Sequence, residues 1–401
     1  MIPLDRALGL LLEGVEPLGA EPVALDAALG RTLAEDLVAT HDQPVEARSA
    51  MDGIAVAVAD PAPGDSFALV GDSPAGAPFA GALSGDQAVR IATGGVVPKG
   101  GLRVIPQELL EFSGGLARLT EECGSSRFIR PAGQDFAEGA RLLAAGTRIG
   151  AGALGLIAAA NVARVPLRRR PEIAILSSGD ELTEPGARLA PGATIDSAGP
   201  MIAALGESWG ARLRRLPRIG DDEAATIAAL REAVAAHDVV VTIGGASVGR
   251  RDFLRGAARA LGAELRFERI AVQPGKPCWH ARFERGAMVL GLPGNPASAF
   301  VCAHLLLRPL VAALLGQAPG PGRLEARLDR KASAGSRTLF LRGVARARQG
   351  SLRVSIAEDQ DSSLVGVLGA SNCLVEIPSG TTLAAGALAR LLLTGELDTT
   401  D

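Results

Sequence analysis

The chain has 401 residues, and 47% of them are hydrophobic, so it can bury large cores and form two to four domains. Its 41 basic residues nearly balance its 44 acidic residues, and aromatic residues make up only 3%. Neither a strong charge nor many stacking side chains are present. The composition therefore argues against nucleic acid or a membrane surface as the main partner.

The cysteines and histidines do not form a recognisable site. No two cysteines have CxxC spacing, and the histidines are equally scattered; these residues are Cys123, Cys278, Cys302, Cys373, His41, His237, His280 and His304. This argues against a disulfide framework, a zinc site and a Ser-His-Asp triad. A metal, if used, is expected to be Mg²⁺ held by carboxylates and ligand phosphates. The N-terminus lacks a signal-peptide pattern and no apolar run reaches about 18 residues, which favours a cytoplasmic location.

The first 170 residues change their pattern twice. Leucines at helical spacing predict helices over 3–18 and 25–37, followed by a polar loop at 42–50. From 51 to about 130, short β-type runs alternate with turns at 54–58, 67–70, 88–92, 103–106 and 116–119, which predicts an inserted β domain. Helical character returns at 151–161. The basic triplet Arg168, Arg169 and Arg170 is interpreted as a solvated linker, in preference to a binding patch.

The next region alternates between strand and helix patterns. Strands are expected at 173–176, 213–216, 239–243 and 288–290, and helices at 198–209, around 223–234 and at 297–307. Asn295 is expected to cap the last helix, Pro296 to start it and Pro309 to kink or end it. After a Gly/Pro-rich linker at 317–322, short strands and turns from 324 to 397 predict a small β barrel or sandwich.

Three glycine-rich loops follow strands of the α/β region, at 177–182, 244–252 and 291–296. The carboxyl ends of parallel strands share one edge of a sheet, so the loops should meet there with their acids Asp180, Glu181 and Asp252. Lys276 lies in a Pro-Gly turn that could aim its ammonium group at an anion. The alternatives are simple turns and an ordinary surface lysine. Asp52, Thr93 and Asp135 lie in comparable small turns of the β insert.

The motifs, taken in order, resemble one family. They are Ser49-Ala-Met51-Asp52-Gly53; Ile91-Ala-Thr93-Gly94 with Val97-Pro98 and Gln107-Glu108; Arg130 with Gly133-Gln134-Asp135; Ser178-Gly179-Asp180-Glu181-Leu182; Ile195-Asp196-Ser197; Gly244-Gly245 with Ser247, Gly249 and Asp252; Pro274-Gly275-Lys276-Pro277; and Gly291-Leu-Pro293-Gly294-Asn295-Pro296. Each is short, but together they resemble the MoeA family of molybdopterin molybdenumtransferases, which is related to the gephyrin E domain.

The resemblance implies an α/β multidomain chain with an elongated L shape. A helical N-terminal domain would comprise 1–40 and 136–170, and the inserted β domain 41–135. A MogA-like α/β domain that binds molybdopterin would span 171–316, and a C-terminal β barrel 322–401. The family is dimeric, so a homodimer is implied, with each active cleft shared between the α/β domain of one subunit and the β insert of the other.

The implied activity is the last step of molybdenum cofactor synthesis. Molybdate is inserted into adenylylated molybdopterin, with Mg²⁺-dependent hydrolysis and release of AMP. The implied catalytic residues are Asp52, Asp135, Glu181, Asp252 and Lys276, and the implied metal ligands are Glu181, Asp221 and Asp252. The implied substrate contacts are Thr93, Ser178, Gly179, Asp180, Gly244, Gly245, Ser247, Gly249, Gln273, Pro293, Gly294, Asn295, Pro296, Arg342 and Ser362. Molybdopterin adenylyltransferase and apo-molybdoenzymes are the implied protein partners.

Four positions depart from the family pattern. Gln273 stands where a lysine is usual, and its loss of a cation would weaken anion binding by about 1–3 kcal/mol unless another group compensates. Arg269 replaces another common lysine and keeps the charge, while Ile54 and Ala198 replace a usual Tyr and Asn. Two alternatives stay open: an adenylyltransferase-like enzyme, against which the Met-Asp-Gly insert argues, and a non-catalytic cofactor-binding scaffold, for which Gln273 leaves room.

Overall fold

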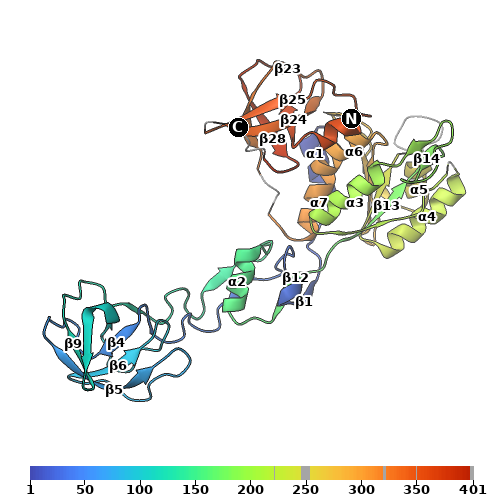
Figure 1. Cartoon of the computed structure of the whole chain (residues 1–401). Coiled ribbons are helices and arrows are strands. Elements are labelled where there is room, and N and C mark those ends of the chain that lie inside the picture. The colour runs from blue at the N-terminus through green and yellow to red at the C-terminus, as the bar shows by residue number, and fades with distance from the viewer. Residues whose placement is uncertain (221, 245–252, 319–321, 349, 398–401) are drawn as a thin grey trace. The chain divides into compact units, whose positions relative to one another are not determined.

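The computed structural model describes residues 1–220, 222–244, 253–318, 322–348 and 350–397, and the chain forms two compact units (Figure 1). The α/β unit comprises Met1–Pro22, Gly30–Ala34 and Pro166–Asp401, and the N-terminal β unit comprises Val23–Leu29 and Glu35–Val165. Each unit is thus assembled from segments that are far apart in the sequence.

The N-terminal β unit is built around a six-stranded sheet. In spatial order its strands are β7 (Arg103–Pro106), β4 (Gly53–Val56), β6 (Gln87–Ile91), β5 (Ser66–Ser73), β9 (Leu116–Leu119) and β8 (Leu110–Ser113). Alternate residues of β4 and β6 enter two separate clusters: Ile54 and Val56 lie in one, and Ala55 and Val89 in the other. All five predicted strands of the insert are therefore confirmed, and β8 is an additional strand.

Short elements complete this part of the chain. They are β1 (Ala20–Ala24), which pairs with β12 (Arg164–Arg168); β2 (Leu37–Val38), which pairs with β11 (Arg141–Leu143); β3 (Arg48–Ser49), which pairs with β10 (Ile129–Arg130); the 3₁₀ turns Leu25–Ala27 and Gln107–Leu109; and α2 (Ala151–Ala159).

The predicted helix at 25–37 is wrong. Only one 3₁₀ turn forms there, because the chain takes a left-handed turn at Gly30 (φ 76°) and Leu33 then pairs with Leu167.

The α/β unit contains a second six-stranded sheet. Its spatial order is β16 (Arg212–Arg215), β13 (Glu172–Ser177), β17 (Val239–Ile243), β21 (Met288–Leu292), β20 (Trp279–Arg282) and β18 (Glu264–Phe267). The first four strands are parallel and the last two antiparallel. Every residue of β17 is buried, as expected for a central parallel strand covered on both faces.

Helices cover the two faces of this sheet. Ile173 and Val239 pack into one core with α1 (Leu4–Leu12) and α3 (Ala198–Ser208), whereas Ala174 and Val240 pack into the other. The second core includes α4 (Glu223–Ala236) and α5 (Phe253–Ala260). Because adjacent residues of one strand enter opposite cores, the β-type period of the sequence is confirmed. The first helix is shorter than the predicted 3–18.

A long helix runs through the first of these cores. It consists of α6 (Pro296–Cys302), a π-helical segment at Ala303–Leu307 and α7 (Arg308–Leu314). Of the two predicted effects of Pro309, a kink or an end of the helix, the second is wrong, since α7 continues past the proline. The π segment ends at Leu307, two residues before Pro309. Pro296–Leu314 is the one described helix that is long and apolar enough to span a membrane, but 78% of its apolar window is buried inside the protein, as in a core helix.

The C-terminal strands close into a barrel. β24 (Thr338–Arg348), β25 (Ser351–Ile356), β22 (Leu324–Leu328), β28 (Leu388–Leu393) and β26 (Cys373–Ile377) follow one another, and β26 pairs back onto β24. The helix α8 (Val365–Gly369) and the pair β23 (Ala332–Ser333) and β27 (Thr382–Leu383) flank it. The two-residue strand β19 (Val272–Gln273) adds to β24 in parallel. The predicted barrel, and with it the α/β multidomain fold class, is confirmed.

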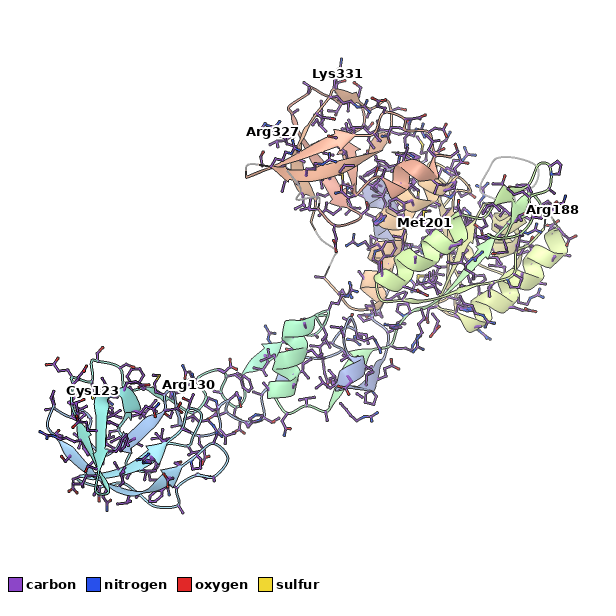
Figure 2. The ribbon with its side chains drawn as sticks, in the orientation of Figure 1. Cys123, Arg130, Arg188, Met201, Arg327 and Lys331 are labelled. Carbon is purple, nitrogen blue, oxygen red and sulfur yellow. The ribbon has the colours of Figure 1, made fainter. Side chains whose placement is uncertain are left out.

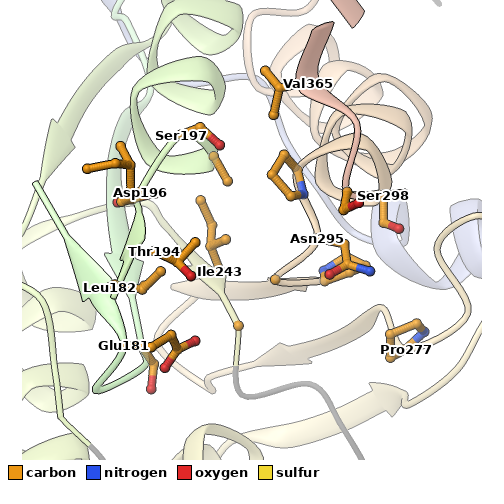
Figure 3. A pocket seen from close by; sticks show the side chains of 18 of the residues that line it. Glu181, Leu182, Thr194, Asp196, Ser197, Ile243, Pro277, Asn295, Ser298 and Val365 are labelled. Carbon is orange, nitrogen blue, oxygen red and sulfur yellow. The ribbon is translucent and has the colours of Figure 1, made fainter. Parts of the chain in front are cut away.

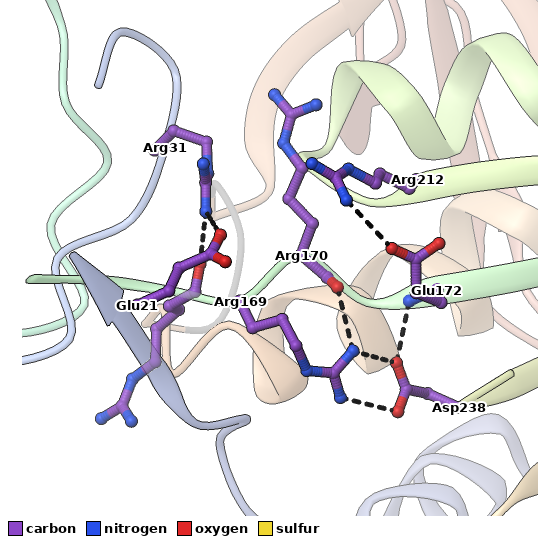
Figure 4. A network of polar contacts seen from close by, with 8 residues as sticks. Glu21, Arg31, Arg169, Arg170, Glu172, Arg212 and Asp238 are labelled. Atoms are coloured by element: carbon purple, nitrogen blue, oxygen red, sulfur yellow. Dashed lines mark hydrogen bonds and ion pairs between the residues drawn. The ribbon is translucent and has the colours of Figure 1, made fainter. Parts of the chain in front are cut away.

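The basic triplet is not a solvated linker, contrary to the prediction. Arg168 donates to the carbonyl oxygens of Leu18 and Ala34, both at 2.9 Å. Arg169 donates to both carboxylate oxygens of Asp238 at 2.9 and 2.8 Å (Figure 4). These hydrogen bonds raise the pKa of Arg169, whereas burial lowers the pKa of Arg170. The triplet therefore fixes the start of β13 to the start of β17.

Asp238→Ala should destabilise the α/β unit. The change removes both acceptors of Arg169 and the acceptor of the Glu172 amide, which lies 2.8 Å from Asp238. We expect a loss of about 1–2 kcal/mol in the free energy of unfolding, measured by denaturant titration, because the pair is half-buried. Arg212→Gln is the matched control, since its ion pair with Glu172 is more exposed. An equal loss in both variants would contradict this role of Asp238.

Candidate functional site

A cavity of about 950 Å³ lies at the carboxyl ends of β13, β17 and β21 (Figure 3). Residues predicted from all three glycine-rich loops line it, together with the predicted lysine: Ser178, Glu181, Gly244, Lys276, Pro293, Gly294, Asn295 and Pro296. Residues that were not among the predicted site residues also line it, including Asp196, Arg269, Ser298, Ser363 and Val365. The structure thus brings the three loops together at one sheet edge, as their positions after parallel strands predicted.

The first loop presents Glu181 to the cavity. Gly179 has a φ of 150°, a conformation that residues with side chains rarely adopt, and a Cβ there would lie 2.7 Å from a carboxylate oxygen of Glu181. The glycine therefore leaves room for the Glu181 side chain to fold back over the loop. Arg218 holds the loop from outside, because it donates to the carbonyl oxygens of Gly179 and Asp180 at 2.9 and 3.3 Å. Gly179 and Asp180 do not line the cavity themselves. Of the two predicted acids, Glu181 is therefore the one at the cavity wall.

Asp196 is a site residue that the prediction missed. It is buried, accepts hydrogen bonds from the Ser177 hydroxyl (3.0 Å) and the Gly199 amide (2.8 Å), and forms an ion pair with Arg215. These contacts tie the end of β13 to the start of α3. The signal was present in the sequence, because an acid directly before a predicted helix commonly binds the first amides of that helix.

The cations of the cavity are Arg269 and Lys276. Gly275 precedes Lys276 with a φ of 125°, and a Cβ on it would lie 2.3 Å from the Cys302 sulfur. This packing fixes the turn that carries the lysine. Gln273 lies outside the cavity lining: its backbone belongs to β19, and its side-chain oxygen accepts a hydrogen bond from Arg337 at 3.0 Å.

The third loop is joined to the barrel. Asn295 occupies the N-cap position of α6, as predicted, but its side chain makes no capping hydrogen bond, because its amide instead donates to the Ser362 hydroxyl at 2.8 Å. Pro296 does occupy the start of the helix, and the Ala297 amide donates to the Ser362 carbonyl at 3.1 Å. Ser362 therefore positions the loop, while its neighbour Ser363 lines the cavity.

Arg342 lies beneath this barrel segment and not in the cavity. Its side chain is buried and donates to Gln360 (3.0 Å) and to the carbonyl oxygen of Asp361 (2.9 Å). Burial lowers its pKa. Arg342 thus holds in place the segment that leads to Ser362 and Ser363.

The loop that follows Gly244 is only partly described. Gly244 has a φ of 88°, and a Cβ on it would lie 2.6 Å from the carbonyl oxygen of Ser178, so glycine is required where the first two loops touch. Five predicted residues lie outside the described part of the chain: Asp221, Gly245, Ser247, Gly249 and Asp252.

The predicted site residues of the N-terminal β unit lie at two separate places on its surface. The Asp52 carboxylate accepts a hydrogen bond from the Thr93 amide at 2.6 Å, so these two loops meet. Asp52 lines a hollow of about 300 Å³ with Arg90. Asp135 lines a different hollow of about 560 Å³, with Arg48 and Arg130. Asp52 and Thr93 are therefore in direct contact, and Asp135 has other neighbours.

Only some of the residues that were predicted to bind a divalent cation lie in the described part of the chain. Across the described ranges, no three His, Cys, Asp or Glu side chains gather as a metal site. Glu181 is the one predicted metal ligand in those ranges, and it is exposed at the cavity wall. One or two carboxylates completed by ligand phosphates suffice for Mg²⁺, so Glu181 fits such a shared ion and not a closed protein cage.

Models of known families match nearly the whole chain. The MoeA N-terminal region (domains I and II) matches residues 2–161, a probable molybdopterin binding domain matches residues 174–313, and the MoeA C-terminal region (domain IV) matches residues 325–393. The middle match covers the α/β sheet and its cavity loops.

Individual proteins agree with this assignment. A molybdopterin molybdenumtransferase of Haemophilus influenzae is 34% identical over 382 residues, or 94% of each chain. One of Bacillus subtilis is 32% identical and covers 95% of this chain and 91% of its own. A crystal structure of a molybdopterin biosynthesis moea protein from Pyrococcus horikosii aligns with a TM-score of 0.85 at 28% identity, over 98% of this chain and 99% of the other. The chain therefore belongs to the MoeA family, as the order of its motifs predicted.

Proposed function

We propose that this protein is a molybdopterin molybdenumtransferase that acts on adenylylated molybdopterin. Its full-length similarity to proteins of that name supports the reaction class. The observation that supports the substrate is the presence of Arg269, Lys276 and two helix N-termini at the wall of the 950 Å³ cavity, since these groups suit a ligand with linked phosphates and a molybdate oxyanion. Molybdate and the adenylylated dithiolene are both substrates in this proposal.

Anion binding is supported by two kinds of positive group. Arg269 and Lys276 supply full charges at the wall. The helices α3 and Pro296–Leu314 both begin at residues that line the cavity, Ala198 and Pro296. The N-terminal end of a helix carries a partial positive charge and free amides, which stabilise phosphate and other oxyanions.

The chemical step is hydrolysis of the pyrophosphate linkage. Water adds its oxygen to one phosphorus, the bond from that phosphorus to the bridging oxygen breaks, and AMP leaves. Mg²⁺ would neutralise charge on the phosphate oxygens, and Glu181 would hold it with Asp221 and Asp252. Lys276 and Arg269 would bind the phosphates, and the loops after β13, β17 and β21 would orient the ligand.

We propose a cytoplasmic homodimer with four domains in each chain, at the boundaries 1–40 with 136–170, 41–135, 171–316 and 322–401. The two subunits together would complete each site, with Asp52, Thr93 and Asp135 contributed by one and the cavity loops by the other. The resemblance supports this arrangement, and the hydrogen bond from the Thr93 amide to Asp52 holds two of the proposed residues together. Molybdopterin adenylyltransferase and apo-molybdoenzymes are the proposed protein partners.

Lys276→Ala should weaken binding of adenylylated molybdopterin about 10- to 100-fold, because the cavity loses a charge-assisted contact to phosphate. Calorimetry with the purified protein measures the affinity, and chromatography of AMP measures turnover. Lys331→Ala is the matched control, since Lys331 is exposed and outside the cavity. If the wild type binds the ligand but releases no AMP with Mg²⁺ and molybdate, the protein is a scaffold and the proposed enzyme activity is wrong.

Mixing Asp52→Ala and Lys276→Ala subunits should restore AMP release at a substrate concentration at which the homodimer of each variant is inactive. In a random mixture half of the dimers are mixed, and each has one intact site, so we expect about a quarter of the wild-type rate of AMP release. Re-formed homodimers of each variant serve as controls. Mixed dimers that form, as judged by two affinity tags, but show no activity would exclude a shared site.

A further inference from the structure

A hollow of about 400 Å³ on the C-terminal barrel is lined by an unusual number of arginines. Four line it: Arg327 on β22, Arg346 and Arg348 on β24, and Arg353 on β25. Figure 2 labels Arg327 on the barrel. Among the described lining residues Asp329 is the one acid, so the hollow has a formal charge of +3. None of its residues lines the 950 Å³ cavity.

The strand register places three of these arginines side by side. Arg346 is the antiparallel partner of Arg353, and Arg353 is the parallel partner of Arg327. Directly paired residues of neighbouring strands project from the same face of a sheet and lie close together. Like charges in such positions are destabilising. The strand register therefore places three like charges next to one another.

In another row of paired residues in the same barrel, opposite charges alternate. Arg390 on β28 is paired on one side with Glu325 and on the other with Glu376, so each like charge is separated by an opposite one. The Arg346–Arg353–Arg327 row has no acid in register. Asp329 is the nearest lining acid, and one of its carboxylate oxygens already accepts from the Ile356 amide at 3.3 Å.

The shape of the row indicates the size of its ligand. Three adjacent strands span about 10 Å, and planar guanidinium groups bind phosphate oxygens in pairs. One phosphate would engage only part of the row, and a hollow of about 400 Å³ is at the small end of ligand pockets. We propose that this hollow binds a small molecule with two or more linked phosphates, either free or carried by a nucleoside.

The test is calorimetric titration of the full-length protein with tripolyphosphate, ATP and adenosine in EDTA. The chelator removes Mg²⁺, so metal-dependent binding in the larger cavity does not contribute. We expect saturable binding of tripolyphosphate and ATP, and none of adenosine. Tighter binding of ATP than of tripolyphosphate would identify a nucleotide ligand, whereas equal affinities would identify the phosphate chain alone.

Variants locate the binding. Arg353→Gln should weaken tripolyphosphate binding at least about tenfold. Arg353→Lys should weaken it less, because lysine keeps the positive charge but loses the paired hydrogen bonds of the guanidinium group. Arg390→Gln removes the same charge from the same barrel and should change affinity less than about twofold. The loss caused by Arg353→Gln should be the same in the Lys276→Ala background, in which phosphate binding by the larger cavity is weakened. Thermal unfolding checks that each variant is folded.

The unliganded protein gives a second measurement. Relief of like-charge repulsion should raise the Tm of Arg353→Gln above the wild type in phosphate-free buffer, and tripolyphosphate should raise the Tm of the wild type more than that of the variant. Absence of saturable binding, or equal effects of Arg353→Gln and Arg390→Gln, would overturn the proposal, since each would mean that the arginines form an unspecific basic surface.

Discussion

The structure depends on complete burial of the central parallel strand β17. Its five residues, Val239–Ile243, are all buried, so helices must cover both faces of the sheet and the connecting loops must lie at its edges. The loops after β13, β17 and β21 then share one edge. The cavity forms at this edge because parallel strands place the loops that follow them on the same side of the sheet.

Close backbone contact makes this edge a defined site. Gly244 touches the Ser178 carbonyl, and any side chain at that position would separate the first two loops. The third loop is fixed from the other direction, since Asn295 and the Ala297 amide both donate to Ser362 of the C-terminal part of the chain. Through these contacts the barrel and the sheet together determine the shape of the cavity wall.

The sequence predicted what depends on local pattern. Short β-type runs located five strands of the N-terminal sheet and the four parallel strands of the α/β sheet, but they missed β8, β18 and β20. Glycine after a buried run located the cavity loops. What failed depends on partners far away in the chain. The leucines of 25–37 have helical spacing, yet Leu33 pairs with Leu167. Arg169 has the composition of a linker, yet it binds Asp238, 69 residues away. Asn295 has the position of a cap, yet it binds Ser362. A rule that uses only neighbouring residues in the sequence cannot identify these distant partners.

The same reasoning gives Gln273 a physical explanation. As a member of β19 it pairs with β24, so its side chain lies at the join between the sheet and the barrel. Arg337 donates to it at 3.0 Å and provides a cation at this join. A lysine at 273 would place a second positive charge against Arg337, whereas glutamine accepts its hydrogen bond. Gln273 therefore has a cation, Arg337, as its neighbour on the facing segment.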